Sequence, residues 1–190
     1  MIRNLLRKLR NRWISRYSPR MISPFFGRDG KPILRTRVSN STFIDQIQGL
    51  DLAENVYIGH HNFLEASHGI RIEEGCQITS FISITSHSSH QSIRLYGKSY
   101  AGKEMIGYIT GSVHIGKYTF VGPHSTIMPN TKIGKGSIVA AYSYVQGEFP
   151  DFAIIAGNPA VVIGDTRERD QAMIAQHPEL KQYYDEWSND

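Results

Sequence analysis

Eight histidines make proton transfer near neutral pH the first chemistry to consider for this sequence. An unperturbed imidazole has a pKa of about 6.5, so histidine is the simplest general base in this range. His87 and His90 lie in a segment rich in serine that begins directly after Ile84. Either histidine is a candidate base, and the alternative is that both are solvated loop residues.

Glu65 is the acidic residue expected to lie nearest to this histidine segment. Glu65 directly follows Leu64, just as Thr85 directly follows Ile84. In the repeat described below, Glu65 and Thr85 are separated by one coil plus two residues. We therefore expect Glu65 to lie one coil away from the His87 segment and on the same side of the fold. There it can orient a histidine or bind a hydroxyl group, and an ordinary exposed acid is the alternative.

Cys76 is the only cysteine, which excludes a disulfide within the chain and favours a reducing compartment. It stands four residues after Ile72, a register that small residues occupy elsewhere in the repeat. We therefore expect a buried packing thiol rather than a nucleophile. The sequence predicts no metal site.

A period of six residues organises the second half of the chain. Large aliphatic residues recur at this spacing, at Ile115, Val121, Ile127, Ile133, Val139 and Val145. Small hydroxyl residues follow the first five of them by four positions, at Thr119, Ser125, Thr131, Ser137 and Ser143. The period appears earlier in two runs, from Leu52 and from Ile72, offset by two residues, and it fails between Ile84 and Ile115.

Such a repeat predicts a β-solenoid. Six residues can form one short strand and one bend, and three units close a triangular coil of about 18 residues. A β-sandwich is the alternative, but its strands recur every 8–12 residues and not strictly every six. We expect a basic N-terminal helix and connector over residues 1–50, a β-helix over 51–164 with a protruding loop over 87–112, and a short C-terminal helical segment over 165–190.

The N-terminal segment, residues 1–20, carries seven basic residues and no acid. The remainder of the chain has 14 basic and 17 acidic residues, so a nucleic-acid surface is not predicted. Apolar residues at helical spacing, among them Leu5, Leu9 and Trp13, form a stripe on this segment. Such a helix can lie in a membrane interface, and the alternative is that the stripe packs on the β-helix or on a neighbouring chain.

Two segments resemble the hexapeptide-repeat acyltransferases: residues 115–122, Ile-Gly-Lys-Tyr-Thr-Phe-Val-Gly, and residues 156–160, Ala-Gly-Asn-Pro-Ala. The branch most similar contains the maltose- and galactoside-acetyltransferase-like enzymes and relatives that act on capsule or lipopolysaccharide sugars. The resemblance covers about residues 52–164. It implies an all-β, left-handed parallel β-helix, a homotrimer, and acetyl-coenzyme A (acetyl-CoA) in a groove between neighbouring coils.

The resemblance also implies roles for individual residues. The family's general base lies at the root of the loop, which favours His87, with His90 second and Glu65 as the acidic partner. The positions that match coenzyme contacts of the family, or lie close to them, are Phe120, Gly122, Ala141, Ser143, Gln146, Asn158 and Arg167. Pro123 departs from the pattern, because proline lacks the N–H that often stabilises the oxyanion in this turn.

The resemblance thus implies an acetyl-CoA-dependent O-acetyltransferase that acts on a saccharide hydroxyl, with no covalent enzyme intermediate and no metal. The alternative is N-acetyl transfer to a nucleotide-linked amino sugar. A zinc hydratase similar to γ-class carbonic anhydrase would need two histidines five residues apart, a spacing that is absent here. A non-catalytic scaffold would have no use for the loop. We expect a cytoplasmic protein, with peripheral contact to the inner face of the membrane through residues 1–20.

Overall fold

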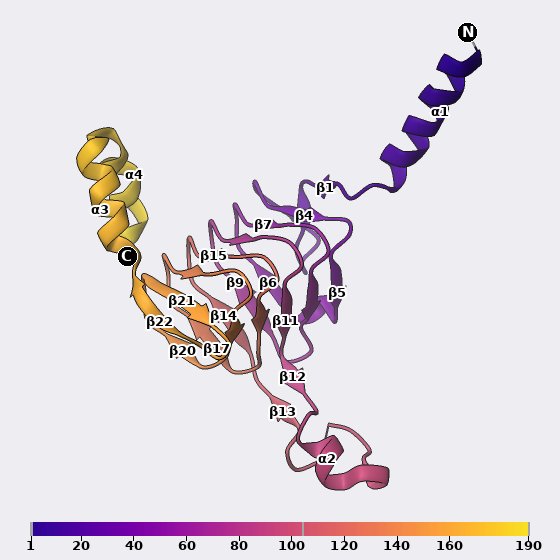
Figure 1. Ribbon diagram of the computed structural model, residues 1–190, viewed down its shortest axis with the longest axis vertical. Coiled ribbons are helices and arrows are strands. Elements are labelled where there is room, and N and C mark those ends of the chain that lie inside the picture. Colours follow the sequence, from indigo (N-terminus) through magenta and orange to yellow (C-terminus); the bar gives the residue numbers. More distant parts are fainter. Residues whose placement is uncertain (1, 104, 190) are drawn as a thin grey trace.

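The computed structural model of the chain, which describes residues 2–103 and 105–189, is a left-handed parallel β-helix with three faces (Figure 1). The first sheet contains β4 (Arg37–Ser39), β7 (Tyr57–Ile58), β10 (Gln77–Ile78), β15 (Phe120–Val121), β18 (Ile138–Val139) and β21 (Ala153–Gly157). The second contains β5 (Phe43–Asp45), β8 (Phe63–Glu65), β11 (Ser83–Thr85), β16 (Thr126–Ile127) and β19 (Tyr144–Val145). The third contains β6 (Leu50–Leu52), β9 (Ile70–Ile72), β14 (Val113–Ile115), β17 (Thr131–Ile133) and β20 (Glu148–Phe149). The predicted β-helix is confirmed.

The predicted apolar period forms the core. The aliphatic residues of each coil point inward and stack on those of the next, and the small hydroxyl residues are buried at the corners, where they donate to backbone carbonyls. Gly122 is required at its corner because an added Cβ would lie 2.6 Å from the backbone nitrogen of Ala141. Close stacking of neighbouring coils thus explains both the glycine and the small residues.

The first coil includes residues that the sequence analysis assigned to the N-terminal connector. Val38 pairs with Ile58 in the first sheet, and Ile58 pairs with Ile78, so these coils have 20 residues. Val121 pairs with Val139, so the later coil has 18. The two extra residues explain the offset between the two early runs, and they lie in the corner between the second and third sheets.

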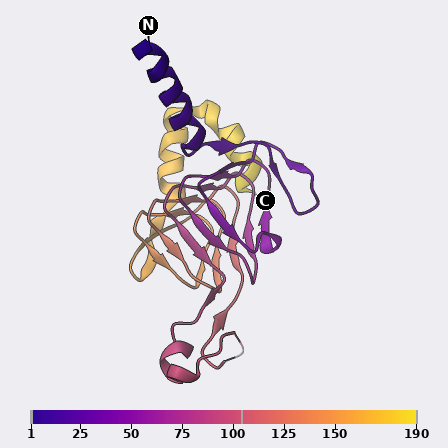
Figure 2. The same cartoon turned by 90° about the vertical axis from the view of Figure 1, so that its right-hand side faces the viewer.

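The protruding loop leaves the β-helix at this same corner, which we call the loop-root corner (Figure 1). It begins with β12 (His87–Ser88), which pairs antiparallel with β13 (Ile109–Thr110), and it contains the short helix α2 (Ser92–Tyr96). Figure 2 shows the loop extending away from one side of the coils. The backbone at the root of the loop therefore has a defined strand pairing.

The terminal helices lie away from this loop. Helix α1 (Ile2–Tyr17) points outward beyond the first coil, and a hairpin of β2 (Phe25–Phe26) and β3 (Pro32–Ile33) follows β1 (Met21–Ile22) (Figures 1 and 2). After the last coil, β22 (Ala160–Asp165) pairs antiparallel with β21. Helices α3 (Thr166–Gln176) and α4 (Lys181–Ser188) end the chain. Within the described residues, none of the helices has the length and apolar character needed to cross a bilayer.

Candidate active site

The structure brings Glu65 and His87 together at the loop-root corner. Glu65 is the last residue of β8 and pairs with Thr85 of β11, as the period predicts. His87 follows two residues later, at the point where the loop leaves the coil. Its Nδ1 lies 2.7 Å from Oε2 of Glu65, so one coil supplies the carboxylate and the next supplies the imidazole.

The Glu65 side chain is only 5% exposed, and both of its carboxylate oxygens accept hydrogen bonds. Its Oε1 accepts from the N–H of Ser67 at 2.8 Å, and its Oε2 accepts from the N–H and hydroxyl of Ser86 at 3.1 and 2.9 Å. Burial raises the pKa of Glu65, but the hydrogen bonds from Ser67 and Ser86 and the neighbouring His87 outweigh it and lower the pKa from 4.5 to about 2. The carboxylate is therefore ionised at neutral pH.

An ionised Glu65 determines the tautomer of His87. A carboxylate can only accept, so Nδ1 of His87 must carry the proton of the 2.7 Å contact. In the neutral imidazole this leaves the lone pair on Nε2. Within the described part of the chain, Nε2 has no hydrogen-bond partner. The imidazole is thus oriented by one nitrogen and available for proton transfer at the other.

Tyr108 stacks on the imidazole ring of His87. Its ring lies 5.4 Å from the imidazole and nearly parallel to it, at 11°. Ser67 Oγ lies 3.3 Å from Nδ1, and the His68 ring stands edge-on at 6.1 Å. No pattern in the sequence pointed to Tyr108, Ser67 or His68 as neighbours of His87. Tyr108 lies in the irregular loop, where no period marks it, and the stacking depends on the β12–β13 pairing.

His90, the second candidate base, is exposed, and its Nδ1 contacts Ser88 Oγ at 2.8 Å. No carboxylate among the described residues contacts it. The geometry that favours a general base is therefore found at His87 and not at His90.

The residues expected to contact the coenzyme do not converge on His87 within one chain. Gly122 and Ala141 lie at the corner between the first and second sheets, and Phe120 lies on the first sheet. Gln146 lies at the loop-root corner but two coils beyond His87. The second sheet lies between this first corner and the loop-root corner, and its strand and bend separate the two corners by roughly 15–20 Å.

Three further predicted coenzyme contacts lie near the C-terminal end of the β-helix. The Ser143 side chain is buried and bonds to the carbonyl of Ala140 and the N–H of Gly157, so only its backbone can face a ligand. Asn158 is exposed in the turn between β21 and β22. Arg167 is exposed but forms an ion pair with Asp165, the residue that caps α3.

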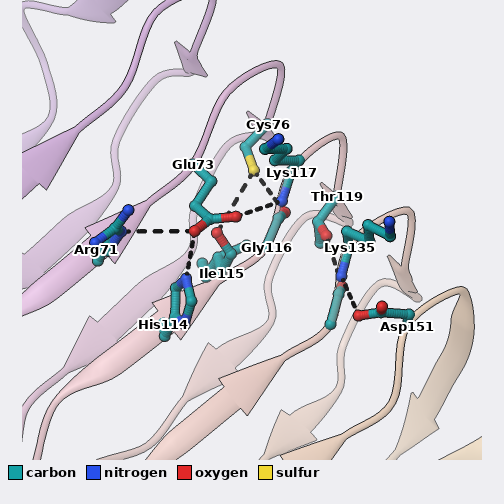
Figure 3. Close-up of polar contacts among 11 residues, drawn as sticks. Arg71, Glu73, Cys76, His114, Ile115, Gly116, Lys117, Thr119, Lys135 and Asp151 are labelled. Atoms are coloured by element: carbon teal, nitrogen blue, oxygen red, sulfur yellow. Dashed lines mark hydrogen bonds and ion pairs between the residues drawn. The ribbon is translucent and has the colours of Figure 1, made fainter. Parts of the chain in front are cut away.

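Cys76 is fully buried, as expected. Burial raises the pKa of its thiol to about 12, and Sγ lies 3.1 Å from the carbonyl of Gly116 (Figure 3). A neutral, enclosed thiol is a poor nucleophile. Within residues 2–103 and 105–189, no three His, Cys, Asp or Glu side chains cluster closely enough to hold a metal ion.

The hydrogen bonds that lower the pKa of Glu65 predict how this residue contributes to stability at different pH values. At pH values above 4.5 the ionised carboxylate should stabilise the folded state by about 2–3 kcal/mol, and this contribution should vanish as the pH falls towards 2. We expect Glu65→Gln to lower the free energy of unfolding at pH 6 and to have a much smaller effect near pH 2.5, measured by urea titration. Glu179→Gln, at an exposed position, is the control, and an equal loss at both pH values would contradict the assignment.

Comparison with known proteins finds matches to transferases. A family model described as bacterial transferase hexapeptide (six repeats) matches residues 112–147. Serine acetyltransferase 4 of Arabidopsis thaliana is 32% identical over 143 residues, which are 74% of this chain and 37% of that protein. A putative lipopolysaccharide biosynthesis O-acetyl transferase, WbbJ of Escherichia coli, is 29% identical over 114 residues, 58% of each chain. This chain therefore spans only part of the length of both relatives.

Solved structures share the architecture. A maltose O-acetyltransferase from Clostridium difficile 630 superposes with a TM-score of 0.57 at 19% identity, covering 66% of this chain and 64% of that one. AntD, an N-acyltransferase from Bacillus cereus in complex with dTDP and 3-hydroxybutyryl-CoA, gives 0.57 at 18% identity, covering 78% and 89%. At these identities the likeness concerns the fold alone.

Proposed function

Because this chain belongs to the hexapeptide-repeat transferases, we propose that it transfers an acetyl group from acetyl-CoA to a hydroxyl group of a saccharide. The observation that carries the proposal is the 2.7 Å contact between Glu65 and His87, which leaves Nε2 free at the root of the loop. The curated relatives add support, because their names describe acetyl transfer to serine and in lipopolysaccharide biosynthesis.

His87 acts as the general base. Its Nε2 takes the proton of the acceptor hydroxyl while the oxygen forms a bond to the thioester carbonyl carbon. The tetrahedral intermediate then collapses, the carbon–sulfur bond breaks, and the proton on Nε2 passes to the departing thiolate of coenzyme A. Glu65 positions the ring and stabilises the imidazolium that forms between the two steps.

The acyl group is transferred directly in this proposal. The only cysteine is enclosed and neutral, so a thioester on the enzyme has no suitable nucleophile. The oxyanion donor comes from outside the turn at Pro123. The N–H groups of Gly122 and His124 are bonded to the carbonyls of Val139 and Ser80, and Pro123 has none.

A homotrimer would complete the site. Phe43 and Phe63 stack at 5.9 Å on the outer surface of the second sheet and are exposed. Beside them lies the aromatic ladder, a stack of exposed rings at the corner between the first and second sheets that comprises His61, Phe81, His124 and Tyr142. An exposed aromatic surface of this kind is typical of an interface. If three copies cover it, the ladder corner of one chain meets the loop-root corner of the next.

A product analysis tests the function. Incubation with acetyl-CoA and a panel of polysaccharides, oligosaccharides and sugar nucleotides should release free coenzyme A and give a product that is heavier by about 42 Da. Mass spectrometry reads this shift, which is the mass of an acetyl group that replaces a hydrogen atom. An ester is cleaved by mild base, whereas an amide survives and would favour the N-acetyl alternative. Failure to bind coenzyme A at all would refute the proposal.

Helix α1 has the features of a membrane-surface helix, and we propose that it contacts anionic lipid. Leu6 and Ile14 are 60% and 57% exposed, and the described basic side chains from Arg3 to Arg10 are also exposed. The Leu5 and Trp13 side chains, part of the predicted stripe, lie outside the described residues. In Figure 1, α1 stands clear of the coils, so the structure does not show the stripe packed on its own β-helix.

Charge removal should weaken this contact strongly. Each basic residue near an anionic surface contributes on the order of 1 kcal/mol, so replacing Arg3, Arg7 and Arg10 by glutamine should reduce vesicle partitioning about 100-fold. Sedimentation with phosphatidylglycerol vesicles at low and high salt measures it. Lys98 and Lys103 replaced by glutamine form the control. Equal binding of the wild type to neutral and anionic vesicles would contradict the proposal, and loss of the trimer in the triple variant would favour packing between chains.

A further inference from the structure

A row of charged side chains follows the outer surface of the third sheet. The parallel register aligns Asp51, Arg71, His114 and Lys132 on four successive strands. His114 is held from one side, because its Nε2 lies 3.0 Å from Oε1 of Glu73, which also contacts Arg71 at 3.6 Å (Figure 3). This second histidine–carboxylate pair is separate from the Glu65–His87 pair and is not used in the proposed transfer step.

Two cavities open along the N-terminal half of this surface. One, of about 420 Å³, is lined by residues that include Arg28, Asp51, Arg71 and His114. The other, of about 650 Å³, lies between the third sheet and the β2–β3 hairpin and includes the rings of Phe25 and Phe26. Arg28 and Asp51 line both cavities, so the two cavities adjoin, and together we call them the third-sheet groove.

The groove ends beside the loop-root corner. Gly69 and Ser112 line its smaller cavity. Gly69 directly follows His68, whose ring stands against that of His87, and the N–H of Gly111, next to Ser112, donates to the carbonyl of Ser86. A chain-like ligand lying in the groove would therefore have one end beside the loop-root corner, where His87 lies.

The lining of the groove indicates the class of ligand. Its charges are balanced, since the lining holds two arginines, Arg28 and Arg71, and two aspartates, Asp29 and Asp51. Arg28 lies 3.9 Å from Asp51, and Arg71 is paired at 3.6 Å with Glu73 outside the lining. Guanidinium, carboxylate and imidazole groups offer donors and acceptors in fixed planes, which suit closely spaced hydroxyls. Phe25 and Phe26 offer apolar ring faces. A pyrophosphate would instead call for cations without a nearby carboxylate.

We propose that the third-sheet groove binds the acceptor as a neutral saccharide segment of several sugar units, with the residue to be modified at the end nearest His87. This inference rests on the proposed function for the identity of the reaction, but the binding itself does not require coenzyme A. It deepens the proposal by favouring a neutral glycan over a nucleotide-linked amino sugar.

Glycan binding by the full chain tests the groove. Labelled protein is applied without coenzyme A to an array of neutral glycans, acidic glycans and nucleotide sugars. We expect binding to neutral oligosaccharides, and at least a tenfold loss of apparent affinity in Arg71→Ala and in Phe26→Ala. Lys132→Ala is the matched control, because Lys132 lies in the same row but lines neither cavity, and it should bind like the wild type.

The outcomes separate the groove from the reaction. Binding only to nucleotide sugars, no glycan binding, or equal effects of Arg71→Ala and Lys132→Ala would each overturn the groove proposal. Binding of coenzyme A, measured in parallel by calorimetry, reports on the transferase proposal instead. If the protein binds neutral glycans through Arg71 but does not bind coenzyme A, the groove proposal stands and the transferase proposal is refuted.

Discussion

Replacement of His87 by alanine is expected to lower turnover about 10²–10⁴-fold, because the acceptor hydroxyl loses the base that takes its proton. The fold should survive, since His87 lies at the loop root outside the aliphatic core and its main contacts are with Glu65 and Tyr108. The release of free thiol from acetyl-CoA measures turnover, and calorimetry measures coenzyme binding, which should be unchanged.

His90→Ala is the matched control for this result. His90 lies three residues further along the same segment, but its ring contacts Ser88, its carbonyl accepts from Arg94, and no carboxylate of the described residues contacts it. We expect this variant to keep most of its activity. If His90→Ala abolishes turnover and His87→Ala does not, the base has been assigned to the wrong histidine.

Mixed trimers should recover activity that neither parent variant shows. In the proposed trimer, His87 of one chain and the ladder corner of the next form one site, so an inactive His87→Ala chain can combine with a chain blocked at Ala141. Ala141→Trp should block the coenzyme because Ala141 is exposed at that corner. Each mixed trimer then holds one intact site out of three, so purified mixed trimers should show about a third of the wild-type activity.

Co-expression of the two variants with different affinity tags, followed by tandem purification, isolates the mixed trimers for the thiol-release assay. Ala141→Ser, which adds little bulk, should be active on its own and shows that the position tolerates substitution. An inactive mixed trimer would mean that each site lies within a single chain. A monomer in solution, seen by light scattering, would contradict the trimer directly.

The six-residue period determined most of the fold without reference to any structure. Inward aliphatic residues at a fixed spacing can be buried only if the coils stack, so the period predicts both the solenoid and the position of the loop where it fails. The same regularity placed Glu65 beside His87, because a separation of one coil becomes a contact between neighbouring strands. The first coil was missed because Val38, Ile44 and Leu50 form only one short run next to an irregular connector.

Only the tertiary structure decided which groups surround that pair. The two extra residues of the early coils lie at the loop-root corner, where Ser67 and His68 join the site, whereas the sequence shows them only as an offset in the period. Tyr108 reaches His87 through a loop without regular spacing, and Arg28 reaches Asp51 through a separate hairpin. A repeat relates residues at fixed separations within stacked coils, but contacts made by loops and hairpins depend on how the chain folds back, and no periodic pattern encodes them.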